Sequence, residues 1–343
     1  MPKVTTTKIA ELAGVSQTTV SAVLNNNDSI KISAQTKERV LSAAKQLGYK
    51  TFNDTGYSGL IAIFIPTLNN PYYARIIEYC ESLLYGQNYF ILLCNTHRHT
   101  DIECQLLTMC FSKKVDGIIY AFTPTATETI NSAVPHIPLV VIGDIEESIA
   151  ADVIGLNSIK AGEMIADHLV KLGHTNIAYI SGPTHSFSHS RQTRLQGIKN
   201  YMQRHDLLSN LNISFYNDEH DSSDNIFELE AGYKLTKELL KSTPRPTAII
   251  AANDMTAVGT VNAIHEMNLS VPEDISVCGF DNIMISENIS PTLTTIDHCL
   301  QMRCRQAISI LLERKKGIDN SGSYKIVYDP ILIVRNSTGK PKE

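Results

Sequence analysis

The hydrophobic and polar positions of the first 50 residues follow the spacing of three short helices. Gly14 interrupts the first run, and Gly48 ends the last one. Thr7, Ser16 and Ser33 stand where a hydroxyl side chain commonly caps the beginning of a helix. The pattern therefore predicts a compact all-α unit at the N-terminus. Its apolar positions are Ile9, Ala10, Leu12 and Ala13, then Val20, Val23 and Leu24, then Val40, Leu41, Ala44 and Leu47.

From residue 59 the pattern changes to apolar runs that alternate with amphipathic stretches. This alternation predicts an α/β fold of parallel sheets flanked by helices. The length favours two lobes over one, and the polar, aperiodic residues 51–58 are typical of a linker. Strands are expected at 60–65, 89–94, 117–121, 139–142, 177–181, 248–251 and 275–279. Helices are expected at 72–85, 102–111, 159–172, 192–203, 226–240, 256–267 and 303–314.

The N-terminal 50 residues and the rest of the chain also differ in net charge. Residues 1–50 hold seven Lys and Arg against three Asp and Glu, a net charge of +4, which leaves −9 for the remainder of a chain of net charge −5. A basic unit at one end of an acidic protein is the distribution expected of a protein that holds DNA by that end.

Several classes of protein are disfavoured by the composition. No apolar run reaches the roughly 18 residues of a membrane span, and the opening residues lack the apolar core of a signal peptide. The 7 cysteines include no CxxC pair, which indicates reduced, structural thiols. His97, His99 and Cys104 lack a further ligand at zinc-like spacing, and no nucleophile–base pair or glycine-rich phosphate loop is present. We therefore expect a cytoplasmic protein that is not an enzyme, with no metal, cofactor or membrane partner.

The first two helices and the glycine between them fit a helix-turn-helix. Gln17 and Thr18 fall at the beginning of the second helix, where a recognition helix presents side chains to base edges in the major groove. Ser16 opens that helix, so its hydroxyl and the neighbouring N–H groups can meet a phosphate. The remaining candidates for DNA contact are Thr7, Thr19, Ser21, Ala22, Asn25 and Ser33.

Residues 9–25, I-A-E-L-A-G-V-S-Q-T-T-V-S-A-V-L-N, resemble the DNA-binding headpiece of the LacI/GalR family of bacterial repressors. The family's second string, S-x-x-T-x-x-x-V followed by L-G-Y, is matched at 33–40 and 47–49. The resemblance implies a double-stranded, pseudo-palindromic DNA operator. Ala22 stands where many members carry Arg or Lys, so only an apolar contact remains, for example with a thymine methyl. The P-N-x-x-A-x-x-L hinge motif is absent after Tyr49, so the resemblance does not extend to a leucine wedge in the minor groove.

Residues 59–335 resemble the same family's periplasmic-binding-protein-like core, which implies a two-lobed effector-binding and dimerisation domain. Landmarks include P-T-L-N-N-P-Y-Y at 66–73 and G-F-D-N at 279–282. Ligands of parallel α/β folds sit beyond the carboxyl ends of the strands, and the polar candidates here follow strands. Carboxylates, an amide, arginines and aromatic rings together suit a small polar effector, and we expect a sugar. The candidates are Asn69, Tyr72, Tyr73, Asp144, Phe187, Arg191, Arg194, Asn253 and Asp281.

Three further hypotheses concern neighbouring features. Asp254 is expected to cap the helix that follows it. Residues 336–343 form a polar tail without apolar heptads, which favours a homodimer over a tetramer. The alternative to a small effector is a phosphorylated carrier protein, since some family members respond to one. This hypothesis needs basic residues on the helix of the first lobe near Arg303, Arg305 and Arg314, which are present. A transport protein and a sugar-modifying enzyme fit the helix-turn-helix and the missing catalytic pair less well.

Overall fold

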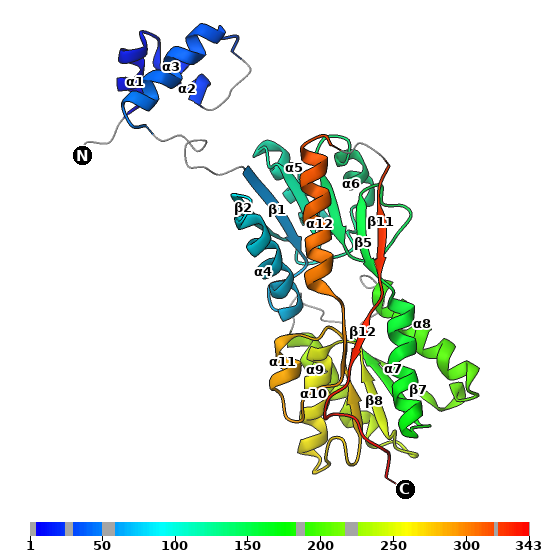
Figure 1. Ribbon diagram of the computed structural model, residues 1–343. Helices are drawn as coiled ribbons and strands as arrows, with labels where there is room; N and C mark the ends of the chain where they lie inside the picture. The colour runs from blue at the N-terminus through cyan, green and yellow to red at the C-terminus, as the bar shows by residue number, and fades with distance from the viewer. Residues whose placement is uncertain are drawn as a thin grey trace. The chain divides into compact units, whose positions relative to one another are not determined.

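The computed structural model describes residues 5–24, 30–49, 59–182, 189–216, 226–318 and 322–342. The chain divides into two compact units, the first built on the three N-terminal helices and the second on the strands and helices from Leu60 onward (Figure 1). Each unit is described by itself below. The segment 51–58, expected to be a linker, lies outside the described residues.

The N-terminal unit is a three-helix bundle around one small core. Ile9, Val20 and Val40, one from each helix, are completely buried. Ser33 caps the third helix as expected, because its Oγ accepts a hydrogen bond from the backbone N–H of Thr36 at 3.2 Å. The helices are α1 (Thr6–Ala13), α2 (Gln17–Leu24) and α3 (Ala34–Gln46).

The expectation that Thr7 caps the first helix is wrong. The N-cap is Thr5, which has extended backbone angles, and Thr7 lies inside α1. Thr5, Thr6 and Thr7 follow one another in the sequence, so residue preference alone could not choose among them. Thr7 remains exposed on the helix surface.

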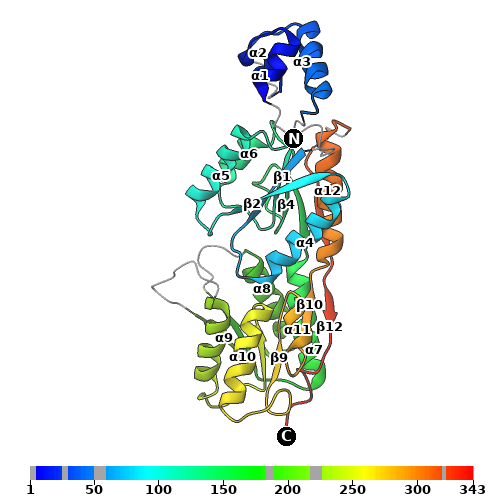
Figure 2. The ribbon, with the colours of Figure 1, turned by 90° about the vertical axis from the view of Figure 1, so that its left-hand side faces the viewer.

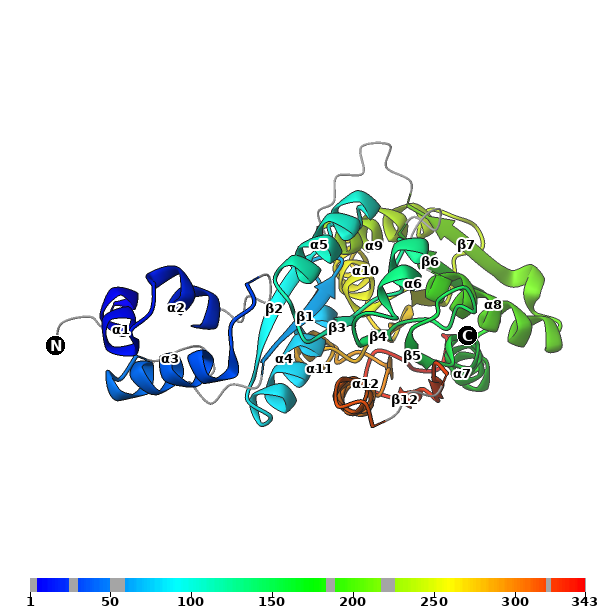
Figure 3. The same cartoon turned by 90° about the horizontal axis from the view of Figure 1, so that it is seen from above.

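The second unit begins with a lobe built on a six-stranded sheet of order β11-β5-β4-β3-β1-β2, in which β1, β3, β4, β5 and β11 pair in parallel. Helices α5 and α6 cover one face, and α4 and α12 lie side by side on the other (Figures 2 and 3). The strands are β1 (Gly59–Ile65), β2 (Tyr89–Asn95), β3 (Gly117–Tyr120), β4 (Leu139–Ile142), β5 (Asp152–Leu156) and β11 (Lys325–Tyr328). The helices are α4 (Pro71–Tyr85), α5 (Thr100–Ser112), α6 (Thr127–Ala133) and α12 (Leu300–Lys315).

The other lobe has a parallel four-stranded sheet of order β7-β6-β8-β9. Helices α7 and α8 cover one face, and α9 and α10 cover the other (Figure 1). The strands are β6 (Ile177–Ser181), β7 (Leu211–Phe215), β8 (Ala248–Ala251) and β9 (Ser276–Cys278). The helices are α7 (Ser158–Leu172), α8 (His189–Arg204), α9 (Ile226–Leu239), α10 (Asp254–Glu266) and the short α11 (Met284–Asn288). The expected α/β class with two parallel sheets is confirmed.

The chain crosses from one lobe to the other at three connections: from β5 to α7, from β10 (Thr295–Asp297) to α12, and from β11 to β12 (Ile331–Ile333). β10 and β12 form a short antiparallel pair. The sequence pattern did not reveal β5, β7, β10, β11, β12, α6 or α11. These elements are short or lie at edges, and β5, β7, β10 and β11 mix polar residues with apolar ones. β12 lies in the apolar run 331–334, which is too short to be a clear signal.

The residues expected to form a polar tail are bound to the second lobe. Ser337 is completely buried; its Oγ donates to the Val277 carbonyl at 2.6 Å and accepts from the Thr294 N–H at 2.8 Å. The imidazole Nε2 of His174 donates to the Gly339 carbonyl at 2.9 Å. This stretch contributes to the lobe because its small polar side chains satisfy buried backbone groups.

Candidate functional site

The turn of the helix-turn-helix depends on a left-handed glycine. Gly14 has φ +63°, a conformation that glycine adopts at little cost, and its N–H bonds to the Glu11 carbonyl at 3.3 Å. Ser16 then caps α2, because its Oγ accepts from the Thr19 N–H at 3.1 Å. The cap occupies the Thr19 N–H and leaves Gln17 and Thr18 in the first turn of α2, at the positive end of the helix dipole.

The candidate DNA residues are mostly on the surface of this unit. Gln17 donates from Nε2 to the Thr6 hydroxyl at 2.9 Å, which orients its side chain along α1. Ala22 differs from the others, since only 5% of it is exposed, and its methyl therefore presents little surface to a base. Asn25 lies outside the described residues. Those exposed are Thr7, Ser16, Gln17, Thr18, Ser21 and Ser33, with Thr19 half-buried.

A pair of side chains from opposite lobes meets where α4 begins. Asn70 caps α4 by accepting the Tyr72 N–H at 2.9 Å, and Pro71 follows it at the first helical position. The Asn70 amide also donates to Oε2 of Glu228, on α9 of the other lobe, at 2.9 Å. Asn69, the sequence candidate, is exposed and makes no such contact. Asn70 and Glu228 were both missed, although the Asn-Pro pair was a signal for a helix cap.

The beginning of α8 also bridges the lobes. Arg191 donates to Oε1 of Glu228, so this buried carboxylate binds an amide from one lobe and a guanidinium from the other. Ser190 donates to Oδ2 of Asp144, just after β4, at 2.5 Å. Two of the sequence candidates, Asp144 and Arg191, are thus held by residues that the sequence had not singled out.

Gly143, before Asp144, permits a close approach of two loops. A Cβ at this position would lie 2.8 Å from both the backbone N and the Oγ1 of Thr123. The Thr123 hydroxyl oxygen in turn accepts the Asp144 N–H at 2.8 Å. A glycine is therefore needed here to place the Asp144 carboxylate at the edge of the sheet.

Arg194, in α8, and Asp281, which follows β9, both belong to the second lobe, and the charge of Arg194 acts on the Asp281 carboxyl. Arg194 donates from Nη1 to the Ala252 carbonyl at 2.9 Å and lies over the Phe280 ring, 4.9 Å from its centroid. Asp281 is 7% exposed and has φ +124°. Burial raises the pKa of the Asp281 carboxyl well above its ordinary value, and the nearby charge of Arg194 opposes that rise.

His298, which follows β10, completes this group. Its Nε2 lies 3.6 Å from Oδ1 of Asp281, and its Nδ1 lies 3.5 Å from the hydroxyl of Tyr72 in the first lobe. Burial lowers the pKa of His298 well below its ordinary value, which favours the neutral imidazole. Eight buried side-chain polar atoms of the described residues have no hydrogen-bond partner, and two of them, Nε2 of His298 and Nε of Arg194, belong to this group. Buried polar atoms of this kind usually bind something, so they mark this group as a candidate ligand site.

The remaining candidates divide between this group and other roles. Tyr73 packs edge-to-face on Tyr72, with ring centroids 5.3 Å apart. Asn253 caps α10, accepting the Thr256 N–H at 2.8 Å, so the expectation that Asp254 forms this cap is wrong. Asp254 instead accepts the Thr295 hydroxyl at 2.6 Å, and burial raises its pKa to about 7. Phe187 lies outside the described residues.

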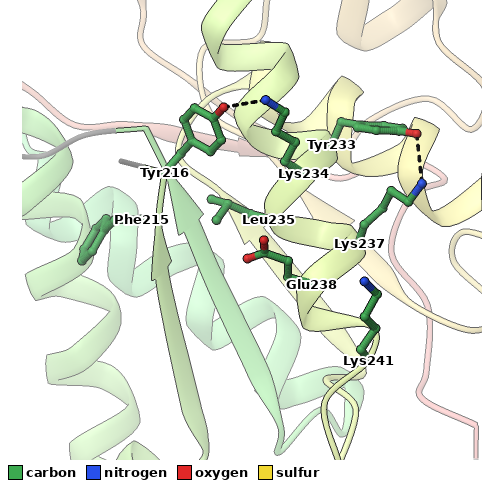
Figure 4. A pocket seen from close by; sticks show the side chains of 8 residues that line it. All are labelled: Phe215, Tyr216, Tyr233, Lys234, Leu235, Lys237, Glu238 and Lys241. Atoms are coloured by element: carbon green, nitrogen blue, oxygen red, sulfur yellow. Dashed lines mark hydrogen bonds between the residues drawn. The ribbon is translucent and has the colours of Figure 1, made fainter. Parts of the chain in front are cut away.

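A separate hollow of about 510 Å³ lies between the end of β7 and α9 (Figure 4). Two of the lysines that line it have partners: Lys234 donates to the Tyr216 hydroxyl at 2.8 Å, and Lys237 pairs with Glu266 at 2.8 Å. None of the sequence candidates lines it. The residues around it are Phe215, Tyr216, Tyr233, Lys234, Leu235, Lys237, Glu238 and Lys241.

Two family models match this chain, one in the N-terminal unit and one in the second unit. Residues 5–51 match the family described as bacterial regulatory proteins, lacI family, and residues 166–338 match the periplasmic binding protein-like domain. A transcriptional repressor named PurR from Haemophilus influenzae (strain PittEE) is 34% identical over 341 residues, covering 96% of this chain and 97% of the relative. The chain belongs to the lacI family of bacterial regulatory proteins. This lacI-family chain is a DNA-binding transcriptional repressor, a role that is not enzymatic.

Solved structures of the lacI family share the fold of the second unit. A LacI family regulator from Enterococcus faecium with bound ribose is 26% identical, with a TM-score of 0.71, and covers 82% of this chain and 100% of that one. A periplasmic binding protein/LacI regulator from Alkaliphilus metalliredigens complexed with D-xylulofuranose is 25% identical, with a TM-score of 0.71 and coverage of 82% and 99%. In the described part of this repressor, no helix is long and apolar enough to cross a membrane.

Proposed function

We propose that a small polar effector, a sugar, binds between the two lobes and controls the repressor's affinity for DNA. The observation that carries this proposal is the pair of buried, unpartnered nitrogens, Nε of Arg194 and Nε2 of His298, beside the Asp281 carboxylate. A carboxylate accepts hydrogen bonds and a guanidinium donates them, and a sugar hydroxyl can do both. Tyr72 adds an aromatic surface from the opposite lobe. The ribose and D-xylulofuranose bound by the two solved relatives support the same ligand class.

We propose that residues near the boundary between the lobes contact the effector. Arg194 and Asp281 would bind it directly, with Tyr72 on the other side. Asp144 makes a lobe-to-lobe contact with Ser190, and Arg191 binds Glu228, which in turn meets Asn70 of the first lobe, so their role would be to close the site. Asn253 is occupied as a helix cap through Oδ1, which leaves its amide group for the ligand.

Control by a phosphorylated carrier protein is less well supported. That mechanism needs arginines of α12 on an open surface. Arg303 is 2% exposed and donates to the Ile154 carbonyl at 2.9 Å, and Arg314 pairs with Asp152 at 2.9 Å. Of the three arginines, Arg305 is the one that is exposed.

Calorimetric titration of the full-length protein separates these two mechanisms. Ribose, other neutral pentoses and hexoses, their phosphate esters and a phosphorylated carrier protein would each be titrated at equal ionic strength. Binding of a neutral sugar that is lost in Asp281→Asn supports the proposal. Binding of the carrier protein alone, unchanged in Asp281→Asn, would refute it.

We also infer that the repressor binds a pseudo-palindromic operator as a homodimer, because a two-fold DNA site is matched by a two-fold protein. Residues 1–50 would be the DNA-binding headpiece and residues 59–335 the effector-binding and dimerisation domain. Light scattering at micromolar concentration tests the dimer, and a stable tetramer would contradict it.

A further inference from the structure

The C-terminal end of α1 lacks a cationic partner within its own helix. The last carbonyl groups of any α-helix have no partner in the helix and carry a partial negative charge. Lysine or arginine in the last turn often compensates for this charge, but the last turn of α1 contains no basic residue. The α1 terminus leads directly into Gly14 and the turn before the recognition helix, so its geometry bears on DNA binding.

Arg39, from α3, supplies the missing partner. Its Nη2 donates to the carbonyl oxygen of Ala13, the last residue of α1, and to that of Gly14 at 3.3 Å. A Cβ at Gly14 would lie 3.1 Å from the same nitrogen, so the glycine also makes room for the guanidinium. One side chain, 25 residues further along the chain, thus binds both carbonyls of the turn.

The neighbouring core does not duplicate this contact. Val40, next to Arg39 in α3, is completely buried against α1 and α2, whereas Arg39 itself remains exposed. The core can therefore hold the three helices together while the guanidinium restricts the turn between α1 and α2. A restricted turn keeps the beginning of α2, with Gln17 and Thr18, at a defined angle.

We infer that Arg39 is a positioning residue for DNA recognition: it sets the angle of the recognition helix through the turn and does not itself read the DNA. The planar guanidinium is suited to this role because it offers several donors at fixed angles. A lysine ammonium carries the same charge but not this arrangement of donors. The role therefore depends on the geometry of the side chain more than on its charge.

Three full-length variants separate geometry from charge. Arg39→Lys keeps the charge and changes the donors, and Arg39→Gln removes the charge and leaves a shorter side chain whose amide is the only donor group. Lys37→Gln is the matched control, because Lys37 is an exposed cation on the same helix that also loses one charge. Each variant is titrated by fluorescence anisotropy, across a salt series, against a duplex selected by the parent protein from a random pool and against a scrambled duplex.

Arg39→Lys is expected to bind the selected duplex about tenfold more weakly, the order of one charge-assisted hydrogen bond. Its binding to scrambled DNA and its salt slope should match those of the parent, because no charge is lost. Lys37→Gln is expected to weaken binding to both duplexes by the same factor. Arg39→Gln should show both the selective loss expected in Arg39→Lys and the general loss expected in Lys37→Gln.

Two outcomes would overturn the inference. If Arg39→Lys bound both duplexes like the parent and Arg39→Gln matched Lys37→Gln, only the charge of Arg39 would matter. If amide exchange showed the whole headpiece unfolded in both Arg39 variants, the contact would stabilise the fold of the headpiece and would not act on the turn alone. Faster exchange confined to Gly14 and Val15 in Arg39→Lys is the pattern that supports the inference.

Discussion

The amide of Asn70 and the carboxylate of Glu228 meet at 2.9 Å, although they lie on opposite lobes and 158 residues apart in the sequence. Arg191 binds the other oxygen of the same carboxylate. Because Glu228 is 4% exposed, these hydrogen bonds are shielded from water and contribute more than they would at the surface. The contact therefore joins the two lobes directly.

Loss of this contact should loosen the lobe boundary. Asn70→Ser keeps an oxygen that can cap α4 but removes the amide that reaches Glu228. Amide hydrogens of Tyr72 and Tyr73, at the beginning of α4, should then exchange about tenfold faster, the order expected for one hydrogen bond to a charged group. The control is Asn176→Ser, which removes an amide that bonds to the Arg245 carbonyl within one lobe. Equal exchange at α4 in both variants would show that the contact does not hold the lobes together.

The proposed effector site predicts a separation of two activities. Asp281→Asn and Arg194→Lys should each weaken effector binding by about 1–3 kcal/mol, because a buried ligand group loses its partner. Their affinity for DNA in the absence of effector should equal that of the parent, since the headpiece is unchanged. Calorimetry with the sugar and anisotropy with the DNA duplex measure the two activities. Asp274→Asn, which alters an exposed ion pair with Lys342, is the control that should change neither.

If Asp281→Asn or Arg194→Lys still responded to the sugar as the parent does, the site between the lobes would not be the control site. If both variants lost DNA binding as well, the substitutions would have disturbed more than effector recognition. Only the loss of the sugar response with intact DNA binding agrees with the proposal.

The free energy of unfolding should decrease as the pH falls, because the buried His174 binds a proton poorly. Burial lowers the pKa of its imidazole, against the opposing hydrogen bond to the Gly339 carbonyl, so the folded protein binds the proton less well than the unfolded chain. No stability is lost while both states are neutral. As the pH falls below about 6.5, the ordinary value for histidine, the unfolded state gains protons and the free energy of unfolding decreases.

His174→Gln offers an acceptor and a donor in the same place without titrating in this range. Urea unfolding between pH 8 and pH 5 should show a smaller loss of stability in this variant than in the parent. The difference between the two proteins is informative, because burial also lowers the pKa of His168 and His298. If the free energy of unfolding fell by the same amount in the parent and the variant, His174 would not be the cause of the pH dependence.

The parts of the fold that the sequence predicted correctly depend on local chemistry. Gly14 and Ser33 could be assigned because a left-handed turn and a helix cap each select few residue types. β7 was missed because Leu, Asn, Ile, Ser and Phe alternate on an edge strand, a weaker signal than a buried run. Glu228 was missed because nothing near it in α9 reveals that Asn70 and Arg191 will face it. Such long-range partners follow from how the lobes fold together.

Selection of DNA from a random pool by the full-length protein tests the central claim most directly, that residues 1–50 read a specific operator. The account predicts a two-fold symmetric motif whose preferred bases change in Gln17→Ala and Thr18→Ala, at about 1–3 kcal/mol for each lost base contact. A protein lacking residues 1–50 should select nothing. Recovery of the same motif by that truncated protein, or no enriched motif with the full-length chain, would contradict the account.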